Sequence, residues 1–270
     1  MVRMSSPNES DPRRNSVLEF LPMQELGLEI APYFNPFIDA ENYSVFYVDC
    51  IDNDEIQSKA ATNPGAKGAK IPRIDAVWVP GKPLKECVGG RKFGYALASH
   101  VMEHVPNPLG WLCEIVDCLD DNGVLALLLP DRRGSMDFYR RETTFGEVVG
   151  WSIEKPVRPT PTQVMDFLSQ SFLDTGNLDF MKQMPAFENA PRTYSDKDAI
   201  NFARWVKEEE RYLDAHVSVW TPDSFKEVFE RIIALDLLPV VLNGPYRRLP
   251  GFHAFEFLVL LRKSPPPKAP

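Results

Sequence analysis

The chain has 270 residues, of which 44% are hydrophobic and 25% charged, a composition that is typical of a globular protein. Its formal net charge is −8 and its pI is about 5.2, so it gains little from releasing the counterions of a polyanion, and a nucleic-acid substrate is disfavoured. No apolar run is long enough to span a membrane, and the polar N-terminus has no signal-peptide pattern, so we expect a cytoplasmic protein without membrane insertion.

In chain order, the pattern opens with a polar segment, residues 1–15, which we expect to be disordered. Short apolar runs then predict strands at five places. The helical spacing of apolar residues over 108–119 predicts a helix before the last of them. Alternating strands and helices indicate an open, mostly parallel α/β sheet. The predicted strands are residues 26–30, 45–49, 74–79, 93–99 and 124–129.

Beyond residue 130 no clear strand appears until the chain's last part. Helical patterns cover 161–172 and 196–212, and Thr221 followed by Pro222 predicts the start of another helix. Two final strands, at 237–242 and 252–261, are joined by Asn243-Gly244-Pro245, which suggests an antiparallel return. We therefore expect a core of residues 16–130 and 221–262, a helical substrate-capping insertion at 131–220, and a proline-rich tail at 263–270.

The end of the first predicted strand is a candidate ligand site. Glu29 ends that strand, and the chain turns at once through Ala31, Pro32 and Asn35, where backbone N–H groups can approach a ligand. Asp49 ends the second strand, where a carboxylate can accept the hydroxyls of a ribose. The alternatives are that the first place is an ordinary turn and that Asp49 is a solvated acid. The spacing of about twenty residues between Glu29 and Asp49 makes the pair a stronger signal than either place alone.

A polar cluster follows the fourth predicted strand. It holds Ser99, His100, Glu103 and His104. The order is not H-E-x-x-H, so a zinc site is disfavoured, and these residues suit the lining of a nucleoside pocket or a general base. A histidine that buttresses the next helix is the structural alternative.

Two further places carry groups that can move a proton. Asp131 follows the fifth predicted strand and can orient a substrate hydroxyl or form an ion pair with Arg132. Asp214 and His216 are two residues apart, so in an extended segment they share a face, and a carboxylate beside an imidazole can activate a hydroxyl.

On these residues the chain resembles the class I S-adenosylmethionine-dependent methyltransferases. Residues 27–129 resemble the core of that family, and residues 93–108 are the most specific part. The stretches 129–133 with 138–140, 212–216 and 220–225 resemble a bacterial subgroup associated with glycan and polysaccharide biosynthesis. The resemblance implies a Rossmann-like, seven-stranded, mostly parallel sheet with a mainly helical insertion after the fifth strand.

The resemblance also implies roles for particular residues. Glu29, Ala31, Pro32 and Asn35 would lie at the methionine end of S-adenosylmethionine and Asp49 at its ribose. The chain departs from the family in having Ala31 for a glycine, Gly94 for an aspartate, and Asn122-Gly123 for a glycine pair. The remaining cofactor-binding residues would be Gly81, Ser99 and His100.

The leading hypothesis is an O-methyltransferase that acts on a sugar hydroxyl of a glycan, oligosaccharide or glycan precursor. One of His104, Asp131, Asp214 and His216 would act as the general base, and Mg²⁺ held by Asp131 or Asp214 is a variant of this mechanism. The alternatives are another small-molecule hydroxyl as acceptor and a methyltransferase fold that serves as a binding or scaffold protein. A nicotinamide-dependent oxidoreductase is disfavoured because G-x-G-x-x-G is absent, and a homodimer is compatible with the sequence.

Overall fold

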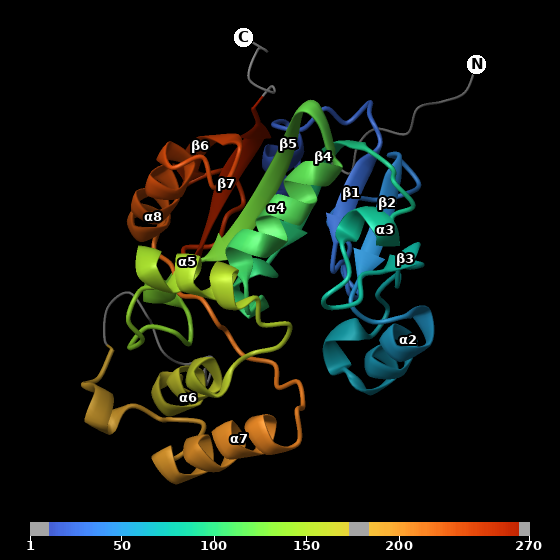
Figure 1. Ribbon diagram of the computed structural model, residues 1–270. Coiled ribbons are helices and arrows are strands. Elements are labelled where there is room, and N and C mark those ends of the chain that lie inside the picture. Colours follow the sequence, from blue (N-terminus) through green and yellow to red (C-terminus); the bar gives the residue numbers. More distant parts are fainter. Residues whose placement is uncertain (1–10, 173–183, 265–270) are drawn as a thin grey trace.

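A computed structural model describes residues 11–172 and 184–264 (Figure 1). Within these residues, seven strands form one sheet in the order β3-β2-β1-β4-β5-β7-β6. Strands β1 to β5 pair in parallel, and β7 runs antiparallel to both of its neighbours. This confirms the predicted Rossmann-like, mostly parallel sheet. The strands are β1 (Gly27–Ile30), β2 (Val45–Asp49), β3 (Ala76–Val77), β4 (Phe93–Ser99), β5 (Leu119–Pro130), β6 (Val240–Tyr246) and β7 (Glu256–Lys263).

Strand boundaries follow the predictions best where the strand is apolar throughout. The bounds of β2 and β4 are those predicted. Only two residues of the predicted strand at 74–79 form β3, because that strand lies at the sheet edge and pairs with β2 alone. Strand β5 starts at Leu119, earlier than predicted, because its first residue pairs with Phe93 and the register with β4 then shifts.

The predicted turn at Asn243-Gly244-Pro245 is wrong. These residues lie inside β6, where the register with β7 shifts between Asn243 and Tyr246, and Gly244 has a φ of 94°. Tyr246 still pairs with Leu258 after this irregularity, so the strand continues and the connection runs over residues 247–255. The predicted antiparallel pairing of the last two strands is confirmed.

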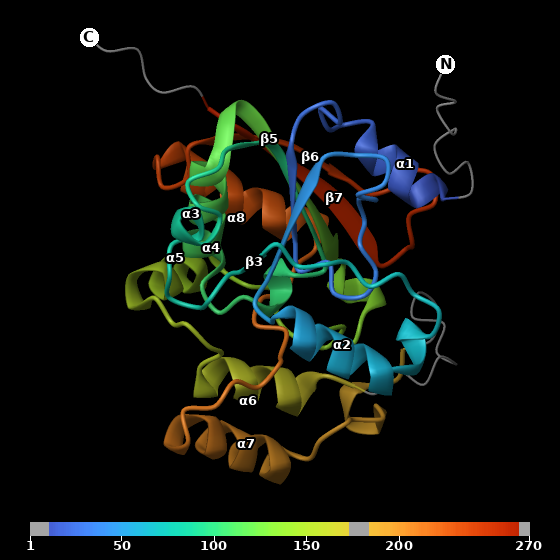
Figure 2. The same ribbon diagram turned by 90° about the vertical axis from the view of Figure 1, so that its right-hand side faces the viewer.

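Helices cover one face of the sheet more fully than the other. Helices α3 (Leu84–Cys87), α4 (Pro108–Cys118), α5 (Phe145–Glu154) and α8 (Pro222–Ala234) lie on the first face (Figure 1). Trp220 is 1% exposed and packs there against Phe225 and Phe229. Helix α1 (Pro12–Leu18) and apolar loop residues cover the opposite face (Figure 2).

Helix α1 corrects the expectation of disorder for the last residues of the N-terminal segment, 11–15. Residues 12–15 are helical, while residues 1–10 lie outside the described residues. Asp11 accepts a hydrogen bond from the Arg14 amide at the helix start, and Arg13 donates to both carboxylate oxygens of Glu256 at 2.7 Å. Residues 11–15 are therefore held in place by a long-range ion pair that local composition does not reveal. Of the predicted tail, Lys263 still belongs to β7, and residues 265–270 lie outside the described residues.

The chain between β5 and α8 carries α5, α6 (Pro161–Gln170) and α7 (Asp196–Glu208), with residues 173–183 outside the described part. Thr144, Thr160 and Ser195 each begin one of these helices in a capping box, in which side chain and backbone exchange hydrogen bonds. Helices α6 and α7 pack together beyond the carboxyl ends of the strands (Figures 1 and 2). Their shared core holds Val164, Leu168, Ala199 and Val206.

The remaining elements are short or peripheral. Helix α2 (Asn53–Thr62) follows β2 and buries Ile56 against the edge of the sheet. No helix within the described ranges combines the length and the apolar character needed to cross a membrane. Four 3₁₀ turns complete the described chain, η1 (Pro64–Ala66), η2 (Met102–His104), η3 (Arg132–Gly134) and η4 (Phe187–Asn189).

The buried aromatic group at the start of α8 provides a test of the fold. Trp220→Ala should lower the free energy of unfolding by about 3–5 kcal/mol, because it leaves a cavity against two phenylalanine rings. Ile153→Ala, at a side chain that is 75% exposed, should stay within about 0.5 kcal/mol of the wild type. Urea unfolding of both variants measures this; equal losses would contradict the packing described.

Candidate functional site

The candidate site lies where the carboxyl ends of β1, β2 and β4 meet. Ile30 of β1 pairs with Val48 on one side and Ala98 on the other, so the residues that follow these strands are neighbours in space. Ligands of open α/β sheets bind at this edge. The structure thus brings Ala31, Asp49 and Ser99 to one end of the sheet.

Glu29 shapes the loop after β1. Its carboxylate is 2% exposed and accepts hydrogen bonds from the amides of Phe37 at 2.5 Å and Ile38 at 2.8 Å. Burial raises the pKa of Glu29 to about 7, although these amides and Arg14 act in the opposite direction. Both oxygens are engaged with the loop, so Glu29 positions the turn rather than offering a free carboxylate.

The turn itself has unusual backbone geometry. Ala31 has a φ of 52°, in the left-handed region that costs an L-residue roughly 1–2 kcal/mol. Pro32 is buried, and its carbonyl accepts from the amide of the exposed Asn35 at 3.0 Å. Gly81, in the exposed turn after β3, has a φ of 86°. Tight turns of this kind leave backbone groups close to the edge of the sheet.

Asp49 carries a buried oxygen with unused hydrogen-bonding capacity. The residue is 4% exposed, and its Oδ1 accepts from the Ile51 amide at 3.3 Å. Its Oδ2 is buried and has no hydrogen-bond partner among the described residues. Burial raises the pKa of Asp49, and nearby amides offset this only in part. Because buried carboxylate oxygens are normally hydrogen-bonded, this atom suits a hydroxyl donor from a ligand.

Ser99 and His100, at the end of β4, are linked to β7 and to helix α1 by polar contacts. His100 Nε2 lies 3.1 Å from Glu256 Oε2, and Arg13 donates to both Ser99 and Glu256. Burial lowers the pKa of His100, but its hydrogen bonds to Glu103 and Glu256 dominate and raise it to about 9. His100 therefore serves as a cationic partner of two buried acids.

Two imidazole–carboxylate pairs face each other beside this network. His104 Nδ1 lies 2.8 Å from Asp214 Oδ1, and His216 Nδ1 lies 2.5 Å from Asp137 Oδ2. The two imidazole rings stand edge to face, with centroids 4.7 Å apart. Burial lowers the pKa of His104, but Asp214 and Glu103 outweigh it and raise that pKa.

This pairing corrects the expectation that Asp214 supports His216. Each of the two residues has a partner from elsewhere in the chain, because the extended segment that carries them is bonded to the loop after β4. The amides of Val217 and Ser218 donate to the Glu103 carbonyl at 2.5 and 3.2 Å. Asp214 consequently meets His104, while His216 points to Asp137.

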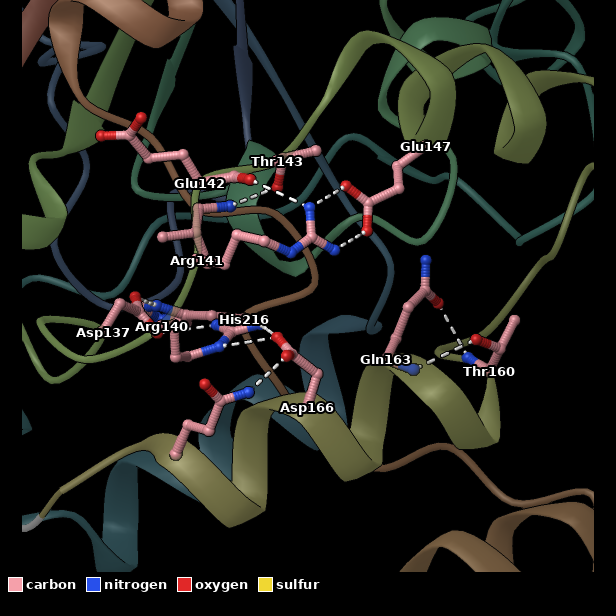
Figure 3. Close-up of polar contacts among 12 residues, drawn as sticks. Asp137, Arg140, Arg141, Glu142, Thr143, Glu147, Thr160, Gln163, Asp166 and His216 are labelled. Carbon is pink, nitrogen blue, oxygen red and sulfur yellow. Dashed lines mark hydrogen bonds and ion pairs between the residues drawn. The ribbon is translucent and has the colours of Figure 1, made fainter. Parts of the chain in front are cut away.

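A buried arginine holds Asp137 in place (Figure 3). Arg140 is 1% exposed and donates to Asp137 at 2.7 Å and to Asp166 of α6 at 2.7 Å. Burial raises the pKa of Asp137, but His216 and Arg140 outweigh it and lower that pKa. The ionised aspartate accepts from His216 Nδ1, which fixes the ring orientation and leaves Nε2 for another partner.

Glu103 lies beneath the two imidazoles. It is 1% exposed; Oε1 lies 3.5 Å from His100 Nδ1, and Oε2 is buried without a hydrogen-bond partner in the part of the chain that the structure describes. Burial alone would raise the pKa of Glu103, but His100, His104 and His216 outweigh it and lower that pKa. Glu103 is thus a buried, ionised carboxylate with a free oxygen.

Asp131 is held apart from this cluster. It forms an ion pair with Arg133, with Oδ1 2.9 Å from Arg133 Nε, and it accepts from the Arg133 amide at the start of η3. The alternative pairing with Arg132 is wrong, since Arg132 contacts Glu142. Within the described residues, the one group that could close on a metal ion is Glu103, His104 and His216, and neither Asp131 nor Asp214 belongs to it.

Sequence reasoning missed three residues of this site and the role of a fourth. Arg13, Asp137 and Glu256 had no local signal, because each acts through a partner distant in sequence; 79 residues separate Asp137 from His216. Glu103 stands beside His104 and was noted there, but nothing in the pattern showed that its oxygen would be buried and free.

Comparison with known proteins gives one family match. The model of the family described as "Methyltransferase domain" matches residues 11–232. No curated protein matches the sequence. Among solved structures, a S-adenosylmethionine-dependent methyltransferase from Clostridium acetobutylicum ATCC 824 is similar at 10% identity, over 95% of this chain and 94% of that one, with a TM-score of 0.46.

Two other solved structures are similar to this chain at comparable identity and TM-score. A putative S-adenosylmethionine-dependent methyltransferase from Listeria monocytogenes has 12% identity over 93% of this chain and 97% of that one, with a TM-score of 0.45. The CurJ carbon methyltransferase has 10% identity and a TM-score of 0.40; 92% of this chain matches 51% of that one. This chain therefore spans about half the length of the CurJ structure.

The backbone of Ala31 generates a prediction about stability. Ala31→Gly should raise the free energy of unfolding by about 1 kcal/mol, because glycine adopts a positive φ without strain. The matched change Ala60→Gly, in the regular helix α2, should lower it by about 1 kcal/mol. Chemical denaturation measures the free energy of unfolding of both variants. If both variants are less stable than the wild type, Ala31 stores no backbone strain.

The buried acid of β7 generates a prediction about pH. Burial raises the pKa of Glu256, but His100 and Arg13 outweigh it and bring that pKa from 4.5 to about 2. Its stabilising contribution is therefore complete above pH 4.5 and is lost as the pH falls toward 2. The stability difference between wild type and Glu256→Gln should shrink over that window.

Unfolding by urea across this acid range, with the exposed Glu55→Gln as control, measures the effect. The control should follow the wild type, because its ion pair with Lys59 is on the surface. A wild-type and Glu256→Gln difference that does not change with pH would contradict the assignment.

Proposed function

This chain belongs to the methyltransferase-domain family, and on that premise we propose that it is a S-adenosylmethionine-dependent O-methyltransferase whose acceptor is a sugar hydroxyl of a glycan, oligosaccharide or glycan precursor. The observation that carries the proposal is the buried oxygen of Asp49 at the carboxyl end of β2, which has no hydrogen-bond partner within the described ranges, at the same end of the sheet as the imidazole pairs that follow β4. The first suits the donor's ribose, and the second suits an acceptor hydroxyl.

The residues at the sheet edge fit the cofactor. Asp49 Oδ2 would accept from a ribose hydroxyl, which supplies the hydrogen bond that the described residues leave unmade. The turn at Ala31 and Pro32, shaped by Glu29, would hold the methionine end, and Gly81 would lie near the adenine. When bound, S-adenosylmethionine supplies a methyl group on a positively charged sulfur.

The imidazole pairs provide a place for the acceptor. His104 and His216 have side chains that are 30% and 13% exposed, so both reach the surface while their carboxylate partners fix their orientation. Transfer of the methyl group to the acceptor oxygen would release S-adenosylhomocysteine and the acceptor's proton, and we propose that an imidazole of this cluster takes up that proton. Asp131, bound to Arg133, has a structural role in this mechanism.

Aromatic side chains near these pairs suit a sugar ring. Tyr212 is 57% exposed, and its hydroxyl donates to Asp214 at 3.0 Å. Phe167 of α6 stacks on the His216 ring with centroids 5.6 Å apart. Trp220 is buried in the core and is excluded from this role.

The alternative of an inactive scaffold draws on the departures from the family at Ala31 and Gly94, and the second has a packing explanation. A Cβ at Gly94 would lie 1.7 Å from Glu25 Oε2, so glycine there reflects local packing against Glu25 rather than a lost function. The positive φ of Ala31 still favours the alternative, because the family's glycine adopts that geometry freely. Direct measurement of cofactor binding separates the two.

Asp49→Asn should weaken binding of S-adenosylmethionine and S-adenosylhomocysteine by roughly 10- to 100-fold, the size expected for losing a hydrogen bond to a charged group. Asp52→Asn, three residues further at the start of α2, should leave affinity unchanged. Titration calorimetry measures both, and NAD should not bind. If the folded wild type binds neither S-adenosylmethionine nor S-adenosylhomocysteine, the scaffold alternative replaces the proposal.

His216→Ala and Asp137→Asn should each lower turnover by roughly 10²- to 10⁴-fold while S-adenosylmethionine affinity stays nearly wild-type. Initial rates with a panel of sugar acceptors measure the first quantity, and calorimetry the second. His253→Ala, a histidine outside the two pairs, is the control. Wild-type rates in both variants, with an acceptor that the wild type methylates, would refute the site assignment.

A further inference from the structure

We propose that Glu103, His104 and His216 form a binding site for a divalent transition-metal ion. Each residue offers one potential ligand atom, and the three atoms lie within 4.8 Å of one another. The donors come from distant parts of the chain, two from the loop after β4 and one from the segment before α8. Two imidazole nitrogens and one carboxylate oxygen are a common donor set for zinc and for non-haem iron.

The imidazoles are already oriented as metal ligands are. Nδ1 of His104 is bonded to Asp214 and Nδ1 of His216 to Asp137, so in each neutral ring Nε2 is the nitrogen with a free lone pair. A carboxylate behind a ligating histidine fixes its tautomer and orientation in most metal sites. Here both histidines have one, and Arg140 in turn holds Asp137 (Figure 3).

Glu103 supplies an independent observation. Its side chain is almost fully buried, with 1% exposure, and its Oε2 is without a hydrogen-bond partner across the ranges that the structure describes. A buried carboxylate oxygen without a hydrogen-bond partner is costly unless another group compensates it. A cation between Oε2 and the two imidazoles would compensate it, whereas a purely structural role for Glu103 needs only its contact with His100.

The backbone makes this cluster preformed. The amides of Val217 and Ser218 donate to the carbonyl of Glu103 itself, so the strand-like segment with His216 is fastened to the residue that provides the carboxylate. His104 follows Glu103 directly within η2. Three ligands held by one backbone junction need little reorganisation on binding, which favours affinity.

The donor set selects the kind of ion. Imidazole nitrogens suit Zn²⁺ and Fe²⁺, whereas Mg²⁺ prefers oxygen donors throughout, so the site should discriminate against Mg²⁺. Three protein ligands leave coordination positions open, as in catalytic zinc sites. The partly exposed histidines place those positions toward the surface where the acceptor is proposed to bind.

A role for the ion in activating the acceptor rests on the proposed function, but the site itself does not. A bound divalent ion lowers the pKa of a hydroxyl that it contacts. Such an ion would lower the pKa of the acceptor hydroxyl so that its proton passes to water, in place of the transfer to an imidazole described above.

The test uses the full chain without an affinity tag, freed of metal by a chelator. Calorimetric titration with Zn²⁺, and with Co²⁺ followed by its visible absorption, should each give one site per chain, and Mg²⁺ should give none. Glu103→Gln and His216→Ala should weaken Co²⁺ binding at least tenfold, and His253→Ala should leave it unchanged. Asp214→Asn should weaken it roughly 10- to 100-fold through its effect on His104.

Asp214 is exposed, so its variant keeps the test valid even if a change at the buried Glu103 prevents folding, which circular dichroism would reveal. Absence of Co²⁺ and Zn²⁺ binding by the wild type overturns the proposal, and so does binding that Asp214→Asn and His216→Ala leave unchanged. Metal binding without S-adenosylmethionine binding would refute the proposed function alone. Methyl transfer without metal binding would refute the metal site alone.

Discussion

The backbone junction between the Glu103 carbonyl and the amides of Val217 and Ser218 is the contact on which the candidate site depends. It holds the extended segment before α8 against the loop after β4. This segment belongs to the insertion that the sequence predicted at residues 131–220. Because a carbonyl has two lone pairs, one oxygen can receive both amides. His104, Glu103 and His216 come together as a direct result of this junction.

Buried charge is organised around that junction in two groups. Glu256 is compensated by Arg13 and His100, and Asp137 by Arg140 and His216. Charges taken out of water are tolerated only when paired and hydrogen-bonded, so each group constrains the elements that supply it. The first ties α1 and β7 to the end of β4. The second ties α6, through Asp166, to the segment that carries His216 (Figure 3).

Two carboxylate oxygens near the edge of the sheet lie outside these two groups and lack hydrogen-bond partners among the described residues. Asp49 Oδ2 and Glu103 Oε2 are both buried and, as far as the described residues go, unpartnered. Because folding penalises such atoms, their presence near the carboxyl ends of parallel strands supports the two ligand sites that we propose. Asp49 suits a neutral hydroxyl donor, and Glu103, with two imidazoles above it, suits a cation.

By itself the sequence determined the sheet and the places where ligands are expected. Apolar runs that need cover on both faces predicted β2 and β4 to the residue, and Thr221 with Pro222 predicted the start of α8, because these signals are local. Only the tertiary structure decided that residues 12–15 are helical, that Asn243-Gly244-Pro245 continues β6, and that His216 pairs with Asp137 instead of Asp214. Each of these outcomes depends on a partner distant in sequence, and the energy of such a contact leaves no periodicity or spacing in the chain from which it could be predicted.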